Sequence, residues 1–141
     1  MATFLIKTEP GDYCYDDLVR DKRTHWDGVT NPAAQMHMRT IKKGDACLFY
    51  HTGKEKRIAG LAKVVKGAYP DPDKPGETKA GDPKFVLFDI APAGAATKDC
   101  TLADVKADGR FDDFALVREP RLSVMPVPAK IDAALRKMAG L

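Results

Sequence analysis

Aromatic and polar side chains gather near the expected ends of strands, and their chemistry suits a pocket for a flat ligand. Trp26 is the only tryptophan and stands between two expected helices. An indole face can stack on any nucleobase, although a tryptophan here also suits a buried core position. Four further residues end a strand or lead into a proline-rich loop and could line the same mouth or simply form a barrel rim: Tyr50, His51, Thr52 and Tyr69.

The patterns of common catalytic and metal sites are missing from the sequence. It holds no GxSxG, P-loop, GxGxxG or EF-hand segment, and its histidines show neither HxxxH nor HExxH spacing. Cys14, Cys47 and Cys100 form no CxxC pair, which favours reduced thiols over disulfides or a zinc site. We therefore expect no metal, no cofactor and no enzymatic activity. Lys7 and Glu9 are the one pair that could in principle perform acid–base work.

Basic side chains cluster locally along the chain. Such clusters are usually solvated surface, and contact with phosphates becomes the better explanation only if they converge around the aromatic pocket. The candidates for phosphate contact are Lys42, Lys43, Lys54, Lys56, Arg57, Arg118 and Arg121.

Length and composition indicate one globular domain over residues 1–141. The chain is 44% hydrophobic and 30% charged, and its formal charge of +3 permits an anion-binding face without requiring one. No apolar stretch approaches the roughly 20 residues of a membrane-spanning helix. Glu9 and Pro10 come too early for a signal peptide. We expect a cytoplasmic protein, monomeric by default, with no membrane partner.

Apolar runs and turn signals predict the elements that position these residues. Strands are expected over residues 2–7, 47–52, 58–66, 85–90 and 121–125. Helices are expected after Asp12 to about residue 20, from Asn31–Pro32 to before Gly44, from the capping box that starts at Thr101, and from Pro128 to Gly140. A long loop fills residues 70–83. Because strands and helices do not alternate strictly, the pattern favours an α+β fold over a doubly wound parallel sheet. The expected architecture is a small, mostly antiparallel sheet curled into a barrel, with helices outside.

Seven separated sequence blocks occur in the order found in the EVE domain family. They are FLIKTEP (4–10), WDGVTNP (26–32), KGD (43–45), FYHT (49–52), IAGLAKVV (58–65), AYPD (68–71) and LVREPRLSV (116–124). The resemblance runs from about residue 3 to 138, and the order of the blocks makes it specific.

This resemblance implies a PUA-like fold, a curled β-barrel of about five to six mainly antiparallel strands with peripheral helices. It also implies kinship with YTH domains, which hold a methylated base in an aromatic cage. The expected function is binding of a flipped, modified base, a modified cytosine in DNA or a modified base in RNA. No catalytic machinery belongs to the family. An enzyme acting on nucleic acid or a nucleotide, and a small-molecule or protein interaction domain, stay as alternatives.

The motifs also imply which residues face the base. Trp26 would stack on it, Asp27 would meet its polar edge, and Ser123 would support the floor. Many relatives carry arginine and asparagine where this chain has Thr30, Ala33, Gln35 and Met36, and the departure removes positive charge. The full implied pocket is Lys7, Thr8, Glu9, Trp26, Asp27, Asn31, Tyr50, His51, Thr52, Tyr69 and Ser123.

Overall fold

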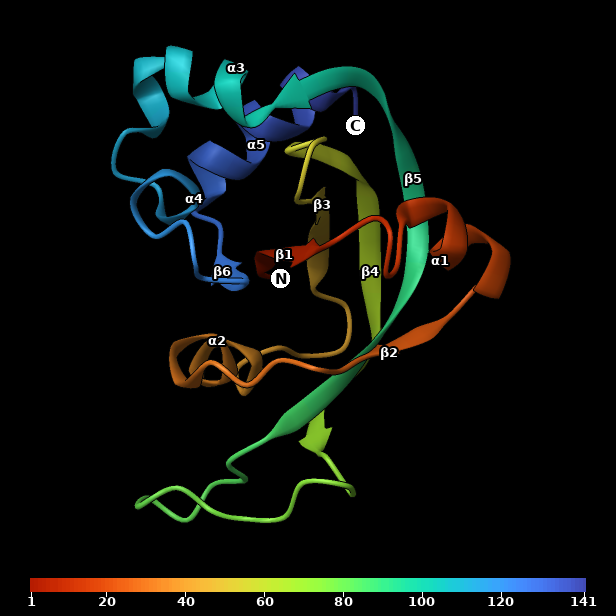
Figure 1. Cartoon of the computed structure of the whole chain (residues 1–141), viewed down its shortest axis with the longest axis vertical. Helices are drawn as coiled ribbons and strands as arrows, with labels where there is room; N and C mark the ends of the chain where they lie inside the picture. The colour runs from red at the N-terminus through yellow and green to blue at the C-terminus, as the bar shows by residue number, and fades with distance from the viewer.

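One curled sheet of six strands organises the molecule (Figure 1), in a computed structural model that describes all 141 residues. The order across the sheet is β2-β5-β4-β3-β1-β6. The strands are β1 (Thr3–Thr8), β2 (Thr24–Trp26), β3 (Ala46–His51), β4 (Arg57–Pro70), β5 (Val86–Thr101) and β6 (Val124–Pro126). All neighbouring strands are antiparallel except β1 and β3. The expected α+β class, with a curled and mainly antiparallel sheet, is confirmed. Because β2 and β6 end the strand order without pairing to each other, the curl stays open as a half-barrel.

Helices lie outside the curl, as expected. They are α1 (Tyr15–Asp21), α2 (Pro32–Met38), α3 (Leu102–Ala107), α4 (Ala115–Arg118) and α5 (Ala129–Ala139), with a short 3-10 helix over Gly109–Phe111. None of them is both long and apolar enough to cross a membrane.

The curl comes from the two longest strands, β4 and β5. Their pairing shifts register at four places along its length. Each bulge adds twist and bends the strand that carries it. In Figure 1, β5 sweeps from the helices at the top of the view past β2 towards the loop at the bottom. The sheet thus wraps around a core that includes the fully buried Phe49, Phe88 and Leu5.

Local signals placed several element ends correctly. Asn31 accepts a hydrogen bond from the backbone N–H of Ala34 (3.1 Å) and so caps α2, with Pro32 in its first turn. Thr101 and Asp104 form the reciprocal capping box that begins α3. Gly140 ends α5 in the left-handed region, at φ 68°.

Other boundaries differ because long-range pairing sets them. Strands β4 and β5 extend well past residues 66 and 90, since each supplies the other with hydrogen-bond partners through the bulges. Helix α2 ends at Met38, five residues before Lys43. The expected strand over 121–125 pairs only through Val124–Pro126. The sequence analysis missed β2, α4 and the 3-10 helix, which are all four residues or shorter.

Tyr15 ties the start of α1 to the bulged region of β4 and β5. Its hydroxyl donates to the carbonyl oxygen of Leu61 (2.7 Å) and accepts from the N–H of Gly94 (3.0 Å). Its ring lies directly over Gly60, where an added Cβ would stand 2.5 Å from two ring carbons. Only a residue without a side chain fits under this ring.

We therefore expect Gly60→Ala to lower the free energy of unfolding by about 1–3 kcal/mol, because the extra methyl group overpacks the contact with Tyr15. Urea denaturation measures the loss. Gly109→Ala is the matched control, since nothing lies within 4 Å of its added Cβ, and it should change stability by less than about 0.5 kcal/mol. Equal stability of the two variants would contradict the contact.

Candidate functional site

A cavity of about 620 Å³ opens at the C-terminal end of β1. Residues from both ends of the strand order line it, because the curl brings β2 close to the chain that leads into β6. The N–H of Lys7 donates to the carbonyl oxygen of Ser123 (2.9 Å), which holds the chain before β6 against the end of β1. The lining residues are 7–9, 12–13, 24–31 and 123.

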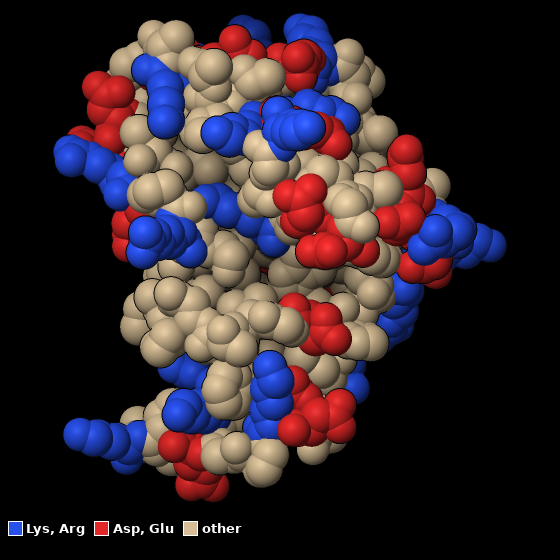
Figure 2. Space-filling view, in the orientation of Figure 1, with Lys and Arg blue, Asp and Glu red and all other residues tan.

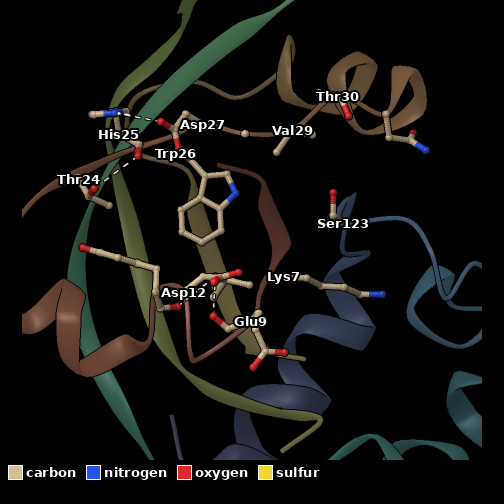
Figure 3. A pocket seen from close by; sticks show the side chains of 14 residues that line it. Lys7, Glu9, Asp12, Thr24, His25, Trp26, Asp27, Val29, Thr30 and Ser123 are labelled. Atoms are coloured by element: carbon tan, nitrogen blue, oxygen red, sulfur yellow. Dashed lines mark hydrogen bonds and ion pairs between the residues drawn. The ribbon is translucent and has the colours of Figure 1, made fainter. Parts of the chain in front are cut away.

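Trp26 lines the cavity and is only 7% exposed. Its ring meets Phe49 edge to face, with centroids 5.4 Å apart and planes at 77°, and lies 6.5 Å from Phe88. Figure 3 shows the indole projecting into the space between Val29, Ser123 and Lys7. The tryptophan is thus a core residue and a wall residue at once.

Carboxylates outnumber cations around the cavity. Glu9, Asp12 and Asp27 stand against the single ammonium group of Lys7. His25 adds Nε2, which lies 3.3 Å from a carboxylate oxygen of Asp27. The wall therefore favours neutral or hydrogen-bond-donating groups and disfavours phosphate.

Lys7 is held in place by its surroundings. Its Nζ donates to the carbonyl oxygen of Pro120 (3.1 Å) and lies 5.9 Å from the centre of the Tyr50 ring. Burial lowers the pKa of this ammonium group, because desolvation penalises its charge. One N–H direction is used by Pro120, and the remaining protons of the ammonium group are free for a ligand.

Two of the implied pocket residues shape the wall through hydrogen bonds of their own. Thr8 Oγ1 donates to the carbonyl oxygen of Tyr13 (3.0 Å), and Asn31 Oδ1 caps α2. Lys7, Thr8, Glu9, Trp26, Asp27, Asn31 and Ser123 all line the cavity.

Of the implied pocket residues, four do not line this cavity: Tyr50, His51, Thr52 and Tyr69. Strand β3 lies inside the sheet between β1 and β4, so its end is covered. Tyr50 is buried, and burial raises its pKa to about 12. His51 Nε2 accepts from the N–H of Tyr15 (3.0 Å), and Nδ1 lies 3.0 Å from Glu55. Thr52 follows on from this covered end, and its N–H donates to the carbonyl oxygen of Thr8.

Tyr69 lies at the far end of β4 and faces another hollow, together with Met36 and Arg39. Its hydroxyl donates to Asp89 Oδ1. Burial and this bond raise the pKa of the phenol to about 12. The bulges between Lys66 and Tyr69 carry this end of the strand away from the cavity.

The basic candidates do not form one patch. Figure 2 shows cationic and anionic side chains intermixed over the visible face, with no continuous basic stripe. Arg57 pairs with Glu55 (2.9 Å), and Arg118 pairs with Asp113 (2.9 Å). Lys42 and Lys43 precede β3 and so lie by the N-terminal end of β1, away from the cavity.

Arg121 and the turn that holds Lys54 and Lys56 are nearer to the cavity. Arg121 is exposed and borders a small hollow that shares Asn31 with it. The Lys54 turn reaches the Glu9 side, where an added Cβ at Gly53 would stand 2.4 Å from Glu9 Oε2.

The cavity also contains residues that the sequence analysis did not assign to it: Asp12, Tyr13, Thr24, His25, Gly28, Val29 and Thr30. All of them lie within the FLIKTEP and WDGVTNP blocks or within three residues of them. Adjacency to the FLIKTEP and WDGVTNP blocks was therefore a usable signal, although it does not say which side chains turn inwards.

The residues that depart from the family pattern have separate positions. Gln35 is buried, its Nε2 donates to the carbonyl oxygen of Val29 (2.7 Å), and its Oε1 accepts from the N–H of Val86 (2.9 Å). It thereby fixes the cavity loop to β5. Thr30 lines the cavity, Ala33 borders the hollow beside Arg121, and Met36 is exposed.

Strand β2, which carries Trp26, is held at the sheet edge by a charged cluster. Asp89 on β5 accepts from Arg23 Nη2 (2.8 Å) and from the Tyr69 hydroxyl. Burial raises the pKa of Asp89, but hydrogen bonds from Tyr69 and Arg23 and the charge of Arg23 outweigh it, so the pKa lies below its ordinary value. The carboxylate thus joins the segment before β2 to β4 and β5.

Comparisons with known proteins agree with this architecture. A model of the EVE domain matches residues 2–138. Human thymocyte nuclear protein 1 is 33% identical over 152 residues, which cover 88% of this chain and 68% of that protein. A Rhodopseudomonas palustris protein solved by NMR superposes with a TM-score of 0.88 at 37% identity, covering 99% of this chain and 94% of the other. The human THYN1 protein, solved in complex with DNA containing 5-methylcytosine, superposes with a TM-score of 0.84 at 27% identity and 98% coverage of each chain.

We expect Asp89→Asn to lower the free energy of unfolding by about 1–3 kcal/mol at neutral pH, because charge-assisted hydrogen bonds are weakened. The folded pKa lies below the unfolded value of about 3.9, so the stabilisation is complete above that value and is lost as the pH falls through the folded pKa. The gap between wild type and variant should therefore narrow in acid, as measured by thermal unfolding across pH. Asp99→Asn, at an exposed residue of the same strand, is the control, and a pH-independent gap would contradict the assignment.

Proposed function

The chain belongs to the EVE domain family, and we propose that it binds a modified base of DNA, flipped out of its strand, in the cavity beside Trp26. The observation that carries the proposal is that the cavity lies where sequence blocks of the family meet. The THYN1 protein, which was solved with DNA containing 5-methylcytosine, covers nearly this whole chain. The cavity is lined by residues of three of the sequence blocks that the chain shares with the family. RNA that carries a modified base is the alternative ligand for the same cavity.

The size of the cavity and the tryptophan in its wall support a single extruded base. A volume of about 620 Å³ falls within the roughly 300–1,000 Å³ of small-molecule sites. Extrusion costs a few kcal/mol in lost stacking and pairing, which contacts inside the pocket must offset. Aromatic contact with a base contributes about 1–3 kcal/mol. Hydrogen bonds to the edge of the base supply the remainder.

The excess of carboxylates supports a base edge over a phosphate as the buried group. Aspartate and glutamate oxygens accept from the exocyclic amino group of cytosine. Glu9, Asp12 and Asp27 offer such acceptors, and Lys7 offers a donor for a ring carbonyl oxygen. A cytosine carries both kinds of group. The phosphates of the strand then remain outside, near Arg121 and the turn holding Lys54 and Lys56.

Binding is better supported than acid–base catalysis by the same residues. The catalytic alternative rests on Lys7 and Glu9, but the Lys7 ammonium already donates to Pro120. The carbonyl oxygen of Glu9 accepts from the N–H groups of Asp12 and Tyr13 (2.9 and 3.0 Å), which fixes the turn after β1. These contacts describe a rigid wall. Cytoplasmic location and a monomeric state stay predictions from the sequence.

We expect oligonucleotides with 5-methylcytosine to bind about four-fold more tightly than unmodified ones and to change the fluorescence of Trp26. One buried methyl group contributes about 0.8 kcal/mol, which corresponds to that ratio. Fluorescence titration of the single tryptophan measures both effects, with duplexes of identical sequence as the comparison. Equal affinities without any change in emission would contradict the proposal.

We expect Arg121→Ala to weaken DNA binding and to reduce the slope of log K against log salt concentration by about 0.9, the value for one phosphate contact. Titration at several salt concentrations gives the slope. Lys43→Ala removes one positive charge at the other end of β1 and should leave the slope nearly unchanged. Identical slopes for both variants would show that position relative to the cavity is irrelevant.

A further inference from the structure

Trp26 has a polar atom that nothing in the protein uses. Trp26 is only 7% exposed, yet its indole Nε1–H has no hydrogen-bond partner within the protein. No side-chain nitrogen or oxygen that is fully buried lacks a partner in this structure. The unpartnered Nε1 therefore reaches the surface of the cavity. Figure 3 shows the nitrogen on the side of the ring that faces Ser123 and Lys7.

The direction of this N–H is fixed by packing. Phe49 and Phe88 contact the ring, and the backbone of Trp26 is paired with Phe88 on β5. Rotating the indole would break an aromatic edge-to-face contact in the core, which is worth about 0.5–1.5 kcal/mol beyond its buried area. The donor is thus presented to the cavity without a conformational cost at binding.

Neighbouring groups on this side of the cavity can also donate hydrogen bonds. In Figure 3 the hydroxyl groups of Thr30 and Ser123 border the space that the indole nitrogen faces, and Lys7 lies below it. Each can donate to a ligand, whereas the carboxylates of Asp12 and Asp27 can only accept when ionised. A ligand must therefore bring an acceptor atom to the indole nitrogen.

We propose that Trp26 Nε1–H donates a hydrogen bond to an acceptor atom of the bound base, a carbonyl oxygen or an unprotonated ring nitrogen. This inference rests on the proposed function and assigns Trp26 a role in selecting the edge of the base. A base that presents a donor or an apolar group at this place leaves the indole N–H without a partner. Sites built on such a donor discriminate strongly against ligands that leave it unpaired.

The single tryptophan makes the test direct, because ¹⁵N-labelled protein has one indole N–H signal. We would titrate labelled wild-type protein with a duplex containing 5-methylcytosine and follow that signal. The expected result is a downfield proton shift and slower exchange of the indole proton with water. Shifts of backbone amides around the cavity, with an indole proton that still exchanges freely, would overturn the hydrogen bond while leaving the proposed function intact. Absence of binding by every modified or plain oligonucleotide would overturn both.

Affinity gives a second, independent measurement. Replacing the tryptophan by its benzothiophene isostere keeps the shape of the ring and removes the donor, so the fold should be retained. We expect an affinity about 10-fold weaker, the size of one hydrogen bond lost from a dry site. Thermal unfolding of the substituted protein verifies the fold. Unchanged affinity for the isostere, in protein of normal stability, would overturn the proposal.

Discussion

Strands β1 and β3 run parallel, and parallel neighbours cannot be joined by a tight turn. A long connection therefore links Thr8 to Ala46, and it builds α1, the edge strand β2 and α2. All lining residues of the cavity except Lys7, Thr8 and Ser123 lie on this connection. The one parallel pair in an otherwise antiparallel sheet is therefore what creates the wall of the site.

A connection of this length needs to be fixed at several points if it is to present a rigid surface. Asp89 holds the segment before β2, Gln35 holds the loop after it, and Tyr15 holds α1 to the bulged strands. Trp26 adds an apolar contact to Phe49 in the centre of the sheet. These restraints come from different elements and converge on the same few residues. The wall is thus anchored to the sheet at several points.

The charges around the site differ from those of a protein that binds DNA mainly through its phosphates. The cavity carries more carboxylates than cations, and the basic side chains near it are dispersed among acids. Much of the affinity of many DNA-binding proteins comes from phosphate contacts that carry no sequence information. A weakly basic exterior around a polar cavity reduces that contribution, so that in the proposed function the contacts inside the pocket decide which nucleic acid is bound.

The sequence by itself determined the fold class, the capped ends of α2, α3 and α5, and three blocks that contribute to the cavity. Caps and turns depend on neighbouring residues, so Asn31, Thr101 and Gly140 could be read directly from the chain. The Trp26 block was recognisable because its residues are contiguous. Only the tertiary structure decided that Tyr50, His51, Thr52 and Tyr69 lie elsewhere, and that Asp12, His25 and Thr30 line the wall. Which residues of a strand meet a cavity depends on its neighbours in the sheet and on its bulges, and these are set by pairing between residues far apart in sequence.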